Sequence, residues 1–145
     1  MAELVAKRST CMRRQVGAIL VKNNQIITTG YNGAPKGVQH CETAGCMRKN
    51  QNVPSGENHE LCRGIHAEQN AIVQAAINGT SLLGAVMYST TFPCVICAKM
   101  IINAEISTVY VLNDYPDKLS KEMFAESATE VILIEDEGRG LRKIV

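Results

Sequence analysis

The sequence predicts an α/β fold in which a mixed sheet is covered by helices on both faces. Short, branched apolar runs alternate with helical segments along most of the chain. The first two of these runs are separated only by a turn. Strands joined through helices pair in parallel, whereas a hairpin pairs antiparallel, so the sheet is expected to be mixed. The 145 residues, 46% of them hydrophobic, suit a single domain with one core.

The N-terminal part predicts a short helix followed by a β-hairpin. Residues 2–8 are typical of the end of a helix, and residues 16–21 (VGAILV) form the short apolar run of a buried strand. Polar residues 22–25 form the turn, and residues 26–30 return as the second strand. From residue 31 to about residue 63, Gly, Pro, Asn and Cys dominate without periodicity. A loop of this length in a small domain needs an organiser of its own.

The rest of the chain alternates helices with strands. Residues 66–78 are rich in Ala with apolar positions at helical spacing, and Gly79 ends the helix. Next come a strand at 85–90, a helix at 95–104, a strand at 108–112, a helix at 118–127 and a strand at 131–134. The expected order is therefore β-β-α-β-α-β-α-β, with five strands. The basic tail, residues 138–145, fits a helix, a strand or a disordered segment equally well.

Charge and targeting signals narrow the class of protein. The formal net charge is +1 with both signs interspersed, which favours a small substrate over a polynucleotide. The N-terminus lacks the apolar core of a signal peptide, and no run approaches the roughly 18–20 apolar residues of a membrane span. We therefore expect a cytoplasmic protein. In a reducing compartment its six cysteines indicate metal binding, although an even number is also compatible with three disulfides.

Two segments carry the residue types of a metal site. The first, HAE at 66–68, opens one predicted helix, and the second, PCVIC at 93–97, opens the next. The unpaired N–H groups at a helix N-terminus favour thiolate over thiol. One imidazole and two thiolates leave a fourth zinc position open, whereas a structural site uses four protein ligands. We expect His66, Cys94 and Cys97 to bind a catalytic Zn²⁺.

Glu68 is the expected proton carrier. Residues two apart point in different directions on a helix, so Glu68 is not expected to share the metal with His66. In the first helical turn its carboxyl reaches a water beside the metal and shuttles protons. A lone CxxC after a strand also fits a thioredoxin-like redox motif. The combination H-x-E and P-C-x-x-C is instead the signature of zinc-dependent nucleobase deaminases.

Longer stretches around these motifs resemble a known family. The chain is similar to the cytidine deaminase-like superfamily and, more narrowly, to the deoxycytidylate (dCMP) deaminases, over roughly residues 1–135. HAE and PCxxC are shared across the superfamily, whereas GYNGAP and the Cys-rich insert select the dCMP branch. The stretches that carry the resemblance are RSTC at 8–11, VGA at 16–18, GYNGAP at 30–35, CRGIHAEQNAI at 62–72 and PCVICAKMII at 93–102.

The resemblance implies both architecture and activity. It implies a three-layer α-β-α sandwich with a five-stranded mixed sheet, and hydrolysis of dCMP to dUMP and ammonia, which supplies dUMP for thymidylate synthesis. It also implies homo-oligomers, with hexamers favoured, activated by dCTP and inhibited by dTTP. The stretch before Ala2 is shorter than in relatives, so the N-terminal helix is expected to be short. The segment near the regulatory and substrate sites of such enzymes is Gly30, Tyr31, Asn32 and Gly33.

A second group of cysteines lies in the long loop. A structural zinc bound there would offset the entropy of ordering that loop, and related phage enzymes carry a second zinc in the corresponding region. We expect Cys41, Cys46 and Cys62 as ligands, with Cys11 or His59 as the fourth. The alternative is that these cysteines stay reduced and pack as small apolar residues.

A nucleotide substrate needs contacts to base, sugar and phosphate. Asn32 follows a strand and carries both donor and acceptor, although Asn-Gly also favours a turn. Tyr115 follows a strand at the edge where α/β proteins bind ligands, and it also suits a surface turn. Asn70, one turn after His66, suits a supporting role beside His66 or a hydrogen bond between two helices. The candidates near the base are Ala67 and Thr91, and those for the phosphate are Ser9, Arg13, Arg14 and Arg63, where any arginine is equally suited to a solvated or interface position.

Other functions share parts of this pattern. Deamination of cytidine, guanine, a riboflavin precursor or tRNA adenosine uses the same motif. A tRNA editor is expected to be more basic and to lack the Cys-rich insert. A non-catalytic, zinc-stabilised binding module is a further alternative, but such a module has no need for Glu68.

Overall fold

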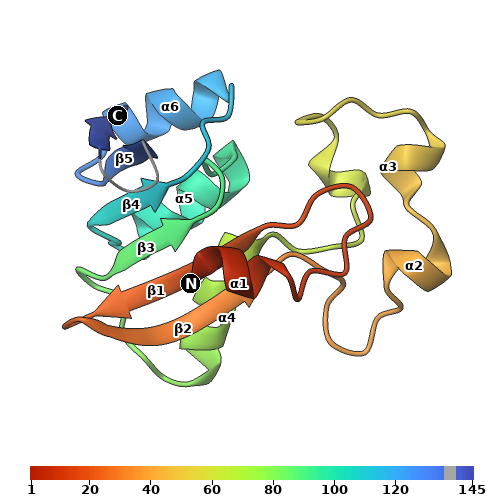
Figure 1. Cartoon of the computed structure of the whole chain (residues 1–145), viewed down its shortest axis with the longest axis horizontal. Coiled ribbons are helices and arrows are strands. Elements are labelled where there is room, and N and C mark those ends of the chain that lie inside the picture. Colours follow the sequence, from red (N-terminus) through yellow and green to blue (C-terminus); the bar gives the residue numbers. More distant parts are fainter. Residues whose placement is uncertain (136–139) are drawn as a thin grey trace.

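The computed structural model describes residues 1–135 and 140–145, and its centre is a mixed sheet of six strands in the order β2-β1-β3-β4-β5-β6 (Figure 1). Strand β1 pairs antiparallel with both β2 and β3, whereas β3, β4 and β5 are parallel. The strands are β1 (Gly17–Lys22), β2 (Gln25–Tyr31), β3 (Val86–Ser89), β4 (Thr108–Val111), β5 (Glu130–Glu135) and β6 (Gly140–Lys143).

The expected number of five strands is wrong, because β6 adds an antiparallel edge strand to β5. Its residues are mostly exposed, so it lacks the buried apolar run that marks the other strands. Pairing alone defines it, through partners such as Leu141 with Ile134. The sequence did not decide the conformation of the tail at 138–145. In the structure, this tail contains a strand at 140–143. Residues 138 and 139 of that tail lie outside the described residues.

Helices cover the two faces of the sheet unequally. Strands β3, β4 and β5 run in the same direction, and right-handed crossovers place the helices that join them on one face. Helix α4 packs on that face against β1 and β2, while α1 lies on the opposite face. Both faces of the sheet therefore carry helices, as expected. Among the described residues, the layer on the second face consists of α1. The helices concerned are α1 (Ala2–Ala6), α4 (Ala67–Ile77), α5 (Val95–Asn103) and α6 (Lys118–Ala125).

Two glycines allow these helices to approach the sheet closely. A Cβ added to Gly17 would collide with the backbone of α1, and one added to Gly30 would collide with the backbone of α4 at Ala67 and Ala71. Gly30 pairs with Ala18, the neighbour of Gly17, and successive strand residues face opposite sides of a sheet. The glycines thus fix helices on both sides of the hairpin, and Gly30 sets the position of the start of α4.

The core lies between the sheet and the three longer helices. Leu20, Met87, Val109 and Val131 are buried and occupy matched positions on four neighbouring strands. Each buried apolar side chain of this size contributes roughly 1.5–3 kcal/mol. On the other face, the rings of Tyr88 and Tyr110 stack with their centroids 5.0 Å apart. The core therefore fixes the ends of β3 and β4, from which the loops to α5 and α6 begin.

The Cys-rich insert projects beyond the sheet as a separate lobe (Figure 1). It begins and ends at a bridge, in which Gly33 and Ile65 exchange backbone hydrogen bonds of 3.2 and 2.9 Å. Between these points the sequence predicted no regular element. Helices of three or four residues are too short to impose a periodic pattern. They are α2 (Cys41–Ala44), α3 (Met47–Asn50) and the 3₁₀ turn η1 (His59–Leu61).

The other predicted helices and strands are present, with ends that differ by one or two residues. In residues 1–135 and 140–145, no helix has both the length and the apolar character that crossing a membrane requires.

Candidate active site

Three predicted metal ligands meet where α4 and α5 begin. His66 is the N-cap residue of α4, Cys94 is the N-cap residue of α5, and Cys97 lies in the first turn of α5. The Sγ atoms of Cys94 and Cys97 lie 3.3 and 3.4 Å from Nδ1 of His66. Among the described residues, this is the one group of three or more His, Cys, Asp or Glu whose ligand atoms all lie within 4.8 Å.

The donor set fits zinc in type and spacing. Bond lengths of about 2.0 Å for Zn–N and 2.3 Å for Zn–S put nitrogen and sulfur about 3.5 Å apart in a tetrahedral site. A hydrogen bond from Cys97, followed by one from His66, lowers the pKa of the Cys94 thiol to about 4. Cys94 is thus prepared as the thiolate that binds metal. Three protein ligands leave a fourth position for water or substrate.

Glu68 lies beside this group on the first turn of α4. Its carboxyl is buried and accepts hydrogen bonds from Ser89 Oγ at 3.3 Å and from Cys97 Sγ at 3.6 Å. Burial raises the pKa of this carboxyl above its ordinary value, because the charged form loses its hydration. A carboxyl with a raised pKa can both take up and return a proton near neutral pH.

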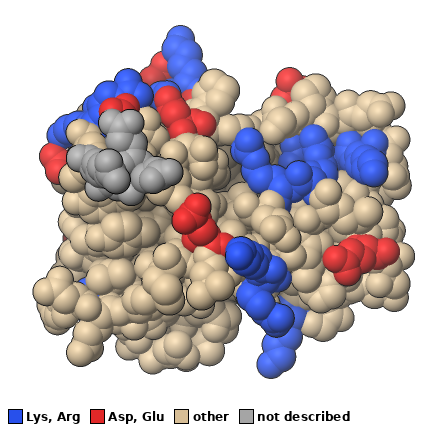
Figure 2. All heavy atoms as spheres, viewed as in Figure 1, with Lys and Arg blue, Asp and Glu red and all other residues tan. Residues whose placement is uncertain are grey.

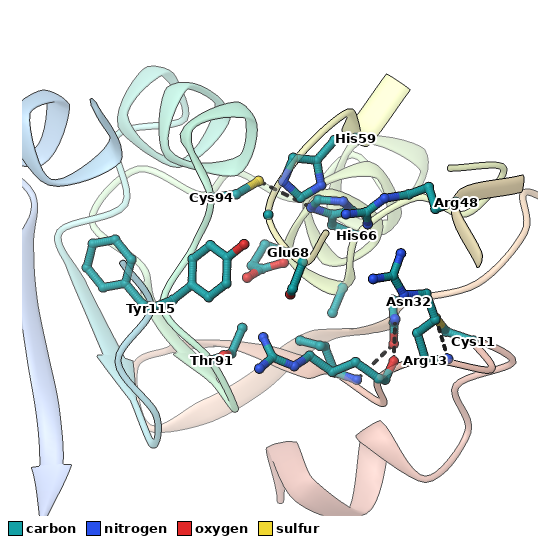
Figure 3. Close-up of a pocket in the computed structure, with 16 residues that line it drawn as sticks. Cys11, Arg13, Asn32, Arg48, His59, His66, Glu68, Thr91, Cys94 and Tyr115 are labelled. Atoms are coloured by element: carbon teal, nitrogen blue, oxygen red, sulfur yellow. Dashed lines mark hydrogen bonds between the residues drawn. The ribbon is translucent and has the colours of Figure 1, made fainter. Parts of the chain in front are cut away.

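A cavity of about 340 Å³ opens onto His66, Cys94 and Glu68 (Figure 3). Three arginines line it, Arg13, Arg14 and Arg48, and Glu68 is the one carboxylate among its lining residues. Side chains from β-sheet loops, from α4 and from the insert contribute to the wall. The cavity therefore carries more positive than negative charge, although the chain as a whole is almost neutral.

Most of the predicted substrate contacts lie at this cavity. Ala67, Thr91, Tyr115, Asn32 and Arg13 line it, and so does Arg14. Tyr115 is half-buried, and its hydroxyl lies against Gly56 of the insert, so the residue is part of the cavity wall.

Three other candidates lie behind the cavity wall or away from it. Ser9 donates a hydrogen bond to Asn32. Arg63 is exposed and donates to the carbonyl of Gln39 at 3.0 Å, and Asn70 donates to the carbonyl of Tyr31 at 3.0 Å. Asn70 therefore joins α4 to the end of β2, and not to a second helix as one of its two predicted roles required.

Asn32 joins the segment before β1 to the end of β2. Its Oδ1 accepts from Ser9 Oγ at 2.6 Å and from the Val16 N–H at 2.8 Å, and its Nδ2 donates to the carbonyl of Arg14 at 2.8 Å. Gly33 pairs with Ile65, so Asn32 and Gly33 do not form a hairpin turn. One N–H of the Asn32 amide is left for a ligand in the cavity.

The other residues of the regulatory candidate segment have packing roles in the structure. Gly30 lies against α4, and the Tyr31 carbonyl holds Asn70 on the same helix. A Cβ on Gly33 would lie 2.5 Å from Thr10 Oγ1. The segment therefore connects the start of α4 with residues that border the cavity.

The second group of cysteines gathers around Cys41, all of them as free thiols. Burial raises the pKa of Cys41, and the proximity of Cys46, Cys62 and Cys11 raises it further. In the described part of the chain, no three of their Sγ atoms all lie within 4.8 Å of one another, as the ligand atoms of His66, Cys94 and Cys97 do. His59 lies elsewhere, with its ring centroid 5.0 Å from that of His66. Of the two candidates for a fourth ligand, Cys11 is the one near Cys41.

The insert supplies cavity residues that the sequence did not indicate. Arg48, Ser55, Gly56 and His59 line the cavity, although no local pattern marks them. Both ring nitrogens of His59 and Nε of Arg48 are buried without a hydrogen-bond partner among the described residues. The insert is therefore part of the site as well as a separate lobe.

Comparison with known proteins identifies the family. Residues 1–113 match the family model for the cytidine and deoxycytidylate deaminase zinc-binding region. The chain belongs to this family. Its fold is similar to that of the dCMP deaminase of cyanophage S-TIM5, whose structure contains dCMP and dUMP, with a TM-score of 0.72 and 34% identity over 90% of this chain and 88% of that one.

Curated members of the family include deoxycytidylate deaminases. The chain is 41% identical to the deoxycytidylate deaminase of Schizosaccharomyces pombe over 79% of its own length and 35% of that protein. It is 38% identical to ComE operon protein 2 of Bacillus subtilis over 92% of its own length and 67% of that protein. The chain thus spans about a third of the first relative and two thirds of the second. The expected resemblance to dCMP deaminases is confirmed.

Proposed function

We propose that this protein hydrolyses dCMP to dUMP and ammonia in a zinc-dependent reaction. The observation that carries the proposal is the cavity, where two members of the His66-Cys94-Cys97 group, His66 and Cys94, line the wall together with Glu68 and three arginines. The first group provides the chemistry of base deamination, and the arginines favour a substrate that carries a phosphate. The presence of dCMP and dUMP in the cyanophage relative supports the same substrate.

The residues of the chain account for the movement of protons. A zinc ion held by His66, Cys94 and Cys97 would act as a Lewis acid that makes water nucleophilic near neutral pH. The Glu68 carboxylate takes the proton that the water loses as its oxygen bonds to C4 of cytosine, and passes it to N3, which receives the electron pair of the opening C4–N3 double bond. Glu68 then takes the second proton from the added oxygen and gives it to the amino nitrogen, so that the C4–N4 bond breaks, ammonia leaves and the C4 carbonyl of dUMP forms. Ser89, through its bond to Glu68, keeps the carboxyl oriented during both transfers.

Ammonia release from a panel of substrates tests this proposal. The panel consists of dCMP, deoxycytidine, cytidine and an RNA hairpin, all at equal concentration. We expect turnover of dCMP to exceed that of the two nucleosides, because only the nucleotide uses the arginines. Preference for a nucleoside or for RNA would contradict dCMP as the substrate. Absence of turnover with all four would favour a zinc-stabilised binding module.

We also propose that dCTP activates and dTTP inhibits the enzyme, and that it assembles as a homo-oligomer, with a hexamer favoured. The similarity to dCMP deaminases supports both statements. The segment Gly30, Tyr31, Asn32 and Gly33 joins α4 to the cavity border, so a ligand bound there would move both. A rate that responds to neither nucleotide would contradict regulation, and sedimentation of a monomer would contradict assembly.

A second, structural zinc held by Cys41, Cys46, Cys62 and Cys11 is a further part of the proposal. The gathering of the other three thiols around Cys41 supports it, and zinc binding would draw their sulfur atoms together while ordering the insert. Elemental analysis of the purified protein distinguishes two zinc ions per chain from one. A value of one would leave these cysteines as packed, reduced thiols.

A further inference from the structure

Two arginines that are distant in sequence are held by neighbouring carbonyl groups of the insert. Arg13 Nη2 donates to the carbonyl of Val53 at 3.1 Å, and Arg48 Nη2 donates to the carbonyl of Pro54 at 2.9 Å. Both side chains line the cavity. In Figure 3 they lie on the opposite side of Glu68 from Tyr115. The backbone at Val53 and Pro54 thus brings two guanidinium groups to one wall of the site.

Neither guanidinium has an acidic partner in the described part of the chain. The ion pairs there involve Lys118, Lys121, Arg142 and Lys143. Glu68, the one carboxylate among the cavity-lining residues, accepts from Ser89 and Cys97. Nε of Arg48 is buried and lacks a hydrogen-bond partner. On the face shown in Figure 2, Lys and Arg side chains also gather around the junction between the insert and the sheet.

A pair of this kind is suited to an anion with several oxygens. Each guanidinium has five N–H donors in a planar fork, and a bond to one carbonyl uses one of them. The remaining donors match a phosphate, which accepts charge-assisted hydrogen bonds from more than one arginine. The carbonyl contacts fix the side chains in advance, so that less rotamer entropy is lost when the ligand binds.

We propose that Arg48, together with Arg13, binds the phosphate of the nucleotide, and that the insert thereby makes the enzyme prefer a nucleotide over a nucleoside. This inference rests on the proposed function, because it assigns residues to the phosphate of that substrate. The insert, which folds around Cys41, then has two roles. It forms a lobe of its own, and it places Arg48 and the carbonyl groups of Val53 and Pro54 at the cavity.

Binding of the product and of its nucleoside separates a phosphate contact from a structural one. The zinc-loaded wild type and Arg48→Gln are titrated with dUMP and with deoxyuridine in a calorimeter. We expect Arg48→Gln to weaken dUMP binding about 10- to 100-fold, the loss typical of a hydrogen bond to a charged group. Binding of deoxyuridine should stay within about twofold, the limit we set for no change, because deoxyuridine has no phosphate.

Lys49→Gln is the matched control. Lys49 is the exposed neighbour of Arg48 and is not among the cavity residues, and its substitution removes the same charge. It should leave the affinity for dUMP unchanged, which excludes a general effect of net charge. Arg48→Lys keeps the cation without the planar fork, so its loss should be smaller than that of Arg48→Gln. This variant also provides the test if Arg48→Gln does not fold.

Any different result of these titrations overturns the inference. Equal weakening of dUMP and deoxyuridine would make Arg48 a structural residue of the insert. Unchanged affinity for dUMP would remove Arg48 from the phosphate site, while turnover of dCMP by the wild type would leave the proposed function intact. A wild type that binds neither ligand and does not turn over dCMP would contradict both.

Discussion

Among residues 1–135 and 140–145, no arginine or lysine is hydrogen-bonded to the buried carboxyl of Glu68. Its hydrogen-bond donors are a hydroxyl and a thiol, and burial raises its pKa. Such an environment does not stabilise a carboxylate strongly, so the side chain is costly for the folded protein. A group of this kind is retained where a proton has to be carried, which is the role expected of it from the HAE motif.

Glu68→Gln should therefore separate chemistry from structure. Glutamine has nearly the same shape but cannot take up or return a proton, so the rate of dCMP deamination should fall at least about 100-fold. Zinc content and thermal stability should not decrease, because Glu68 is not one of the three metal ligands. Ammonia release and elemental analysis of the same sample provide the measurements. Normal turnover by this variant would show that another group moves the protons.

At the scale of elements, one aspartate joins two helices at the site. Asp117 caps α6 by accepting from the Ser120 N–H at 2.9 Å, and its other oxygen accepts from the Val95 N–H at 2.8 Å, in the first turn of α5. Ser120 Oγ donates to the carbonyl of Pro93 at 2.7 Å. The start of α5, which carries both cysteine ligands, is thus fixed by α6.

Asp117→Ala should loosen the metal site from a distance. Two backbone N–H groups lose their acceptor, which should lower the free energy of unfolding by about 2 kcal/mol. Because α5 then begins less rigidly, zinc should be removed faster by a chelator. Urea denaturation and the rate of zinc transfer to a colorimetric chelator measure the two effects. Asp114→Ala, which removes an exposed pair with Lys121, is the control; equal behaviour of both variants would contradict the role of Asp117.

At the scale of the whole molecule, the site lies where the sheet domain and the insert meet. The starts of α4 and α5 supply the predicted metal ligands, the segment before β1 supplies Arg13, and the insert supplies Arg48 and His59. A metal ion bound by His66 at the start of α4 and by Cys94 and Cys97 at the start of α5 would link these two helices directly. Metal binding is therefore expected to stabilise the fold as well as enable catalysis.

Removal of zinc should lower both activity and stability. A metal present at 1,000 times its dissociation constant stabilises the folded state by about 4 kcal/mol, and this amount is lost on chelation. We expect the chelated protein to unfold at a lower temperature, to be inactive, and to recover both properties when zinc is returned. Differential scanning calorimetry and ammonia release follow the cycle. Full activity in rigorously metal-free protein would contradict the zinc-dependent mechanism.

Local patterns were sufficient to predict the regular elements of the sheet domain other than β6, and to predict that His66, Cys94 and Cys97 lie together with Glu68 beside them. Strands such as β1 and β4 are short, branched and apolar, and α4 has helical spacing, so each shows its periodicity in a few residues. His66, Glu68, Cys94 and Cys97 could be predicted because helix starts and fixed spacing determine where they point. The residues proposed for the chemistry lie in two short segments, so a local sequence motif is enough to predict them.

Only the tertiary structure decided the features that depend on contacts between distant segments. Strand β6 exists through pairing with β5, Asn32 is a bridge rather than a turn residue, and His59 lies beside His66 rather than among the cysteines. Arg48 reaches the cavity because the carbonyl of Pro54 holds it there. Such positions follow from long-range packing and hydrogen bonding, which leave no recurring pattern along the chain. Helices, strands and metal-binding motifs, in contrast, show a regular period or a fixed spacing within a short segment.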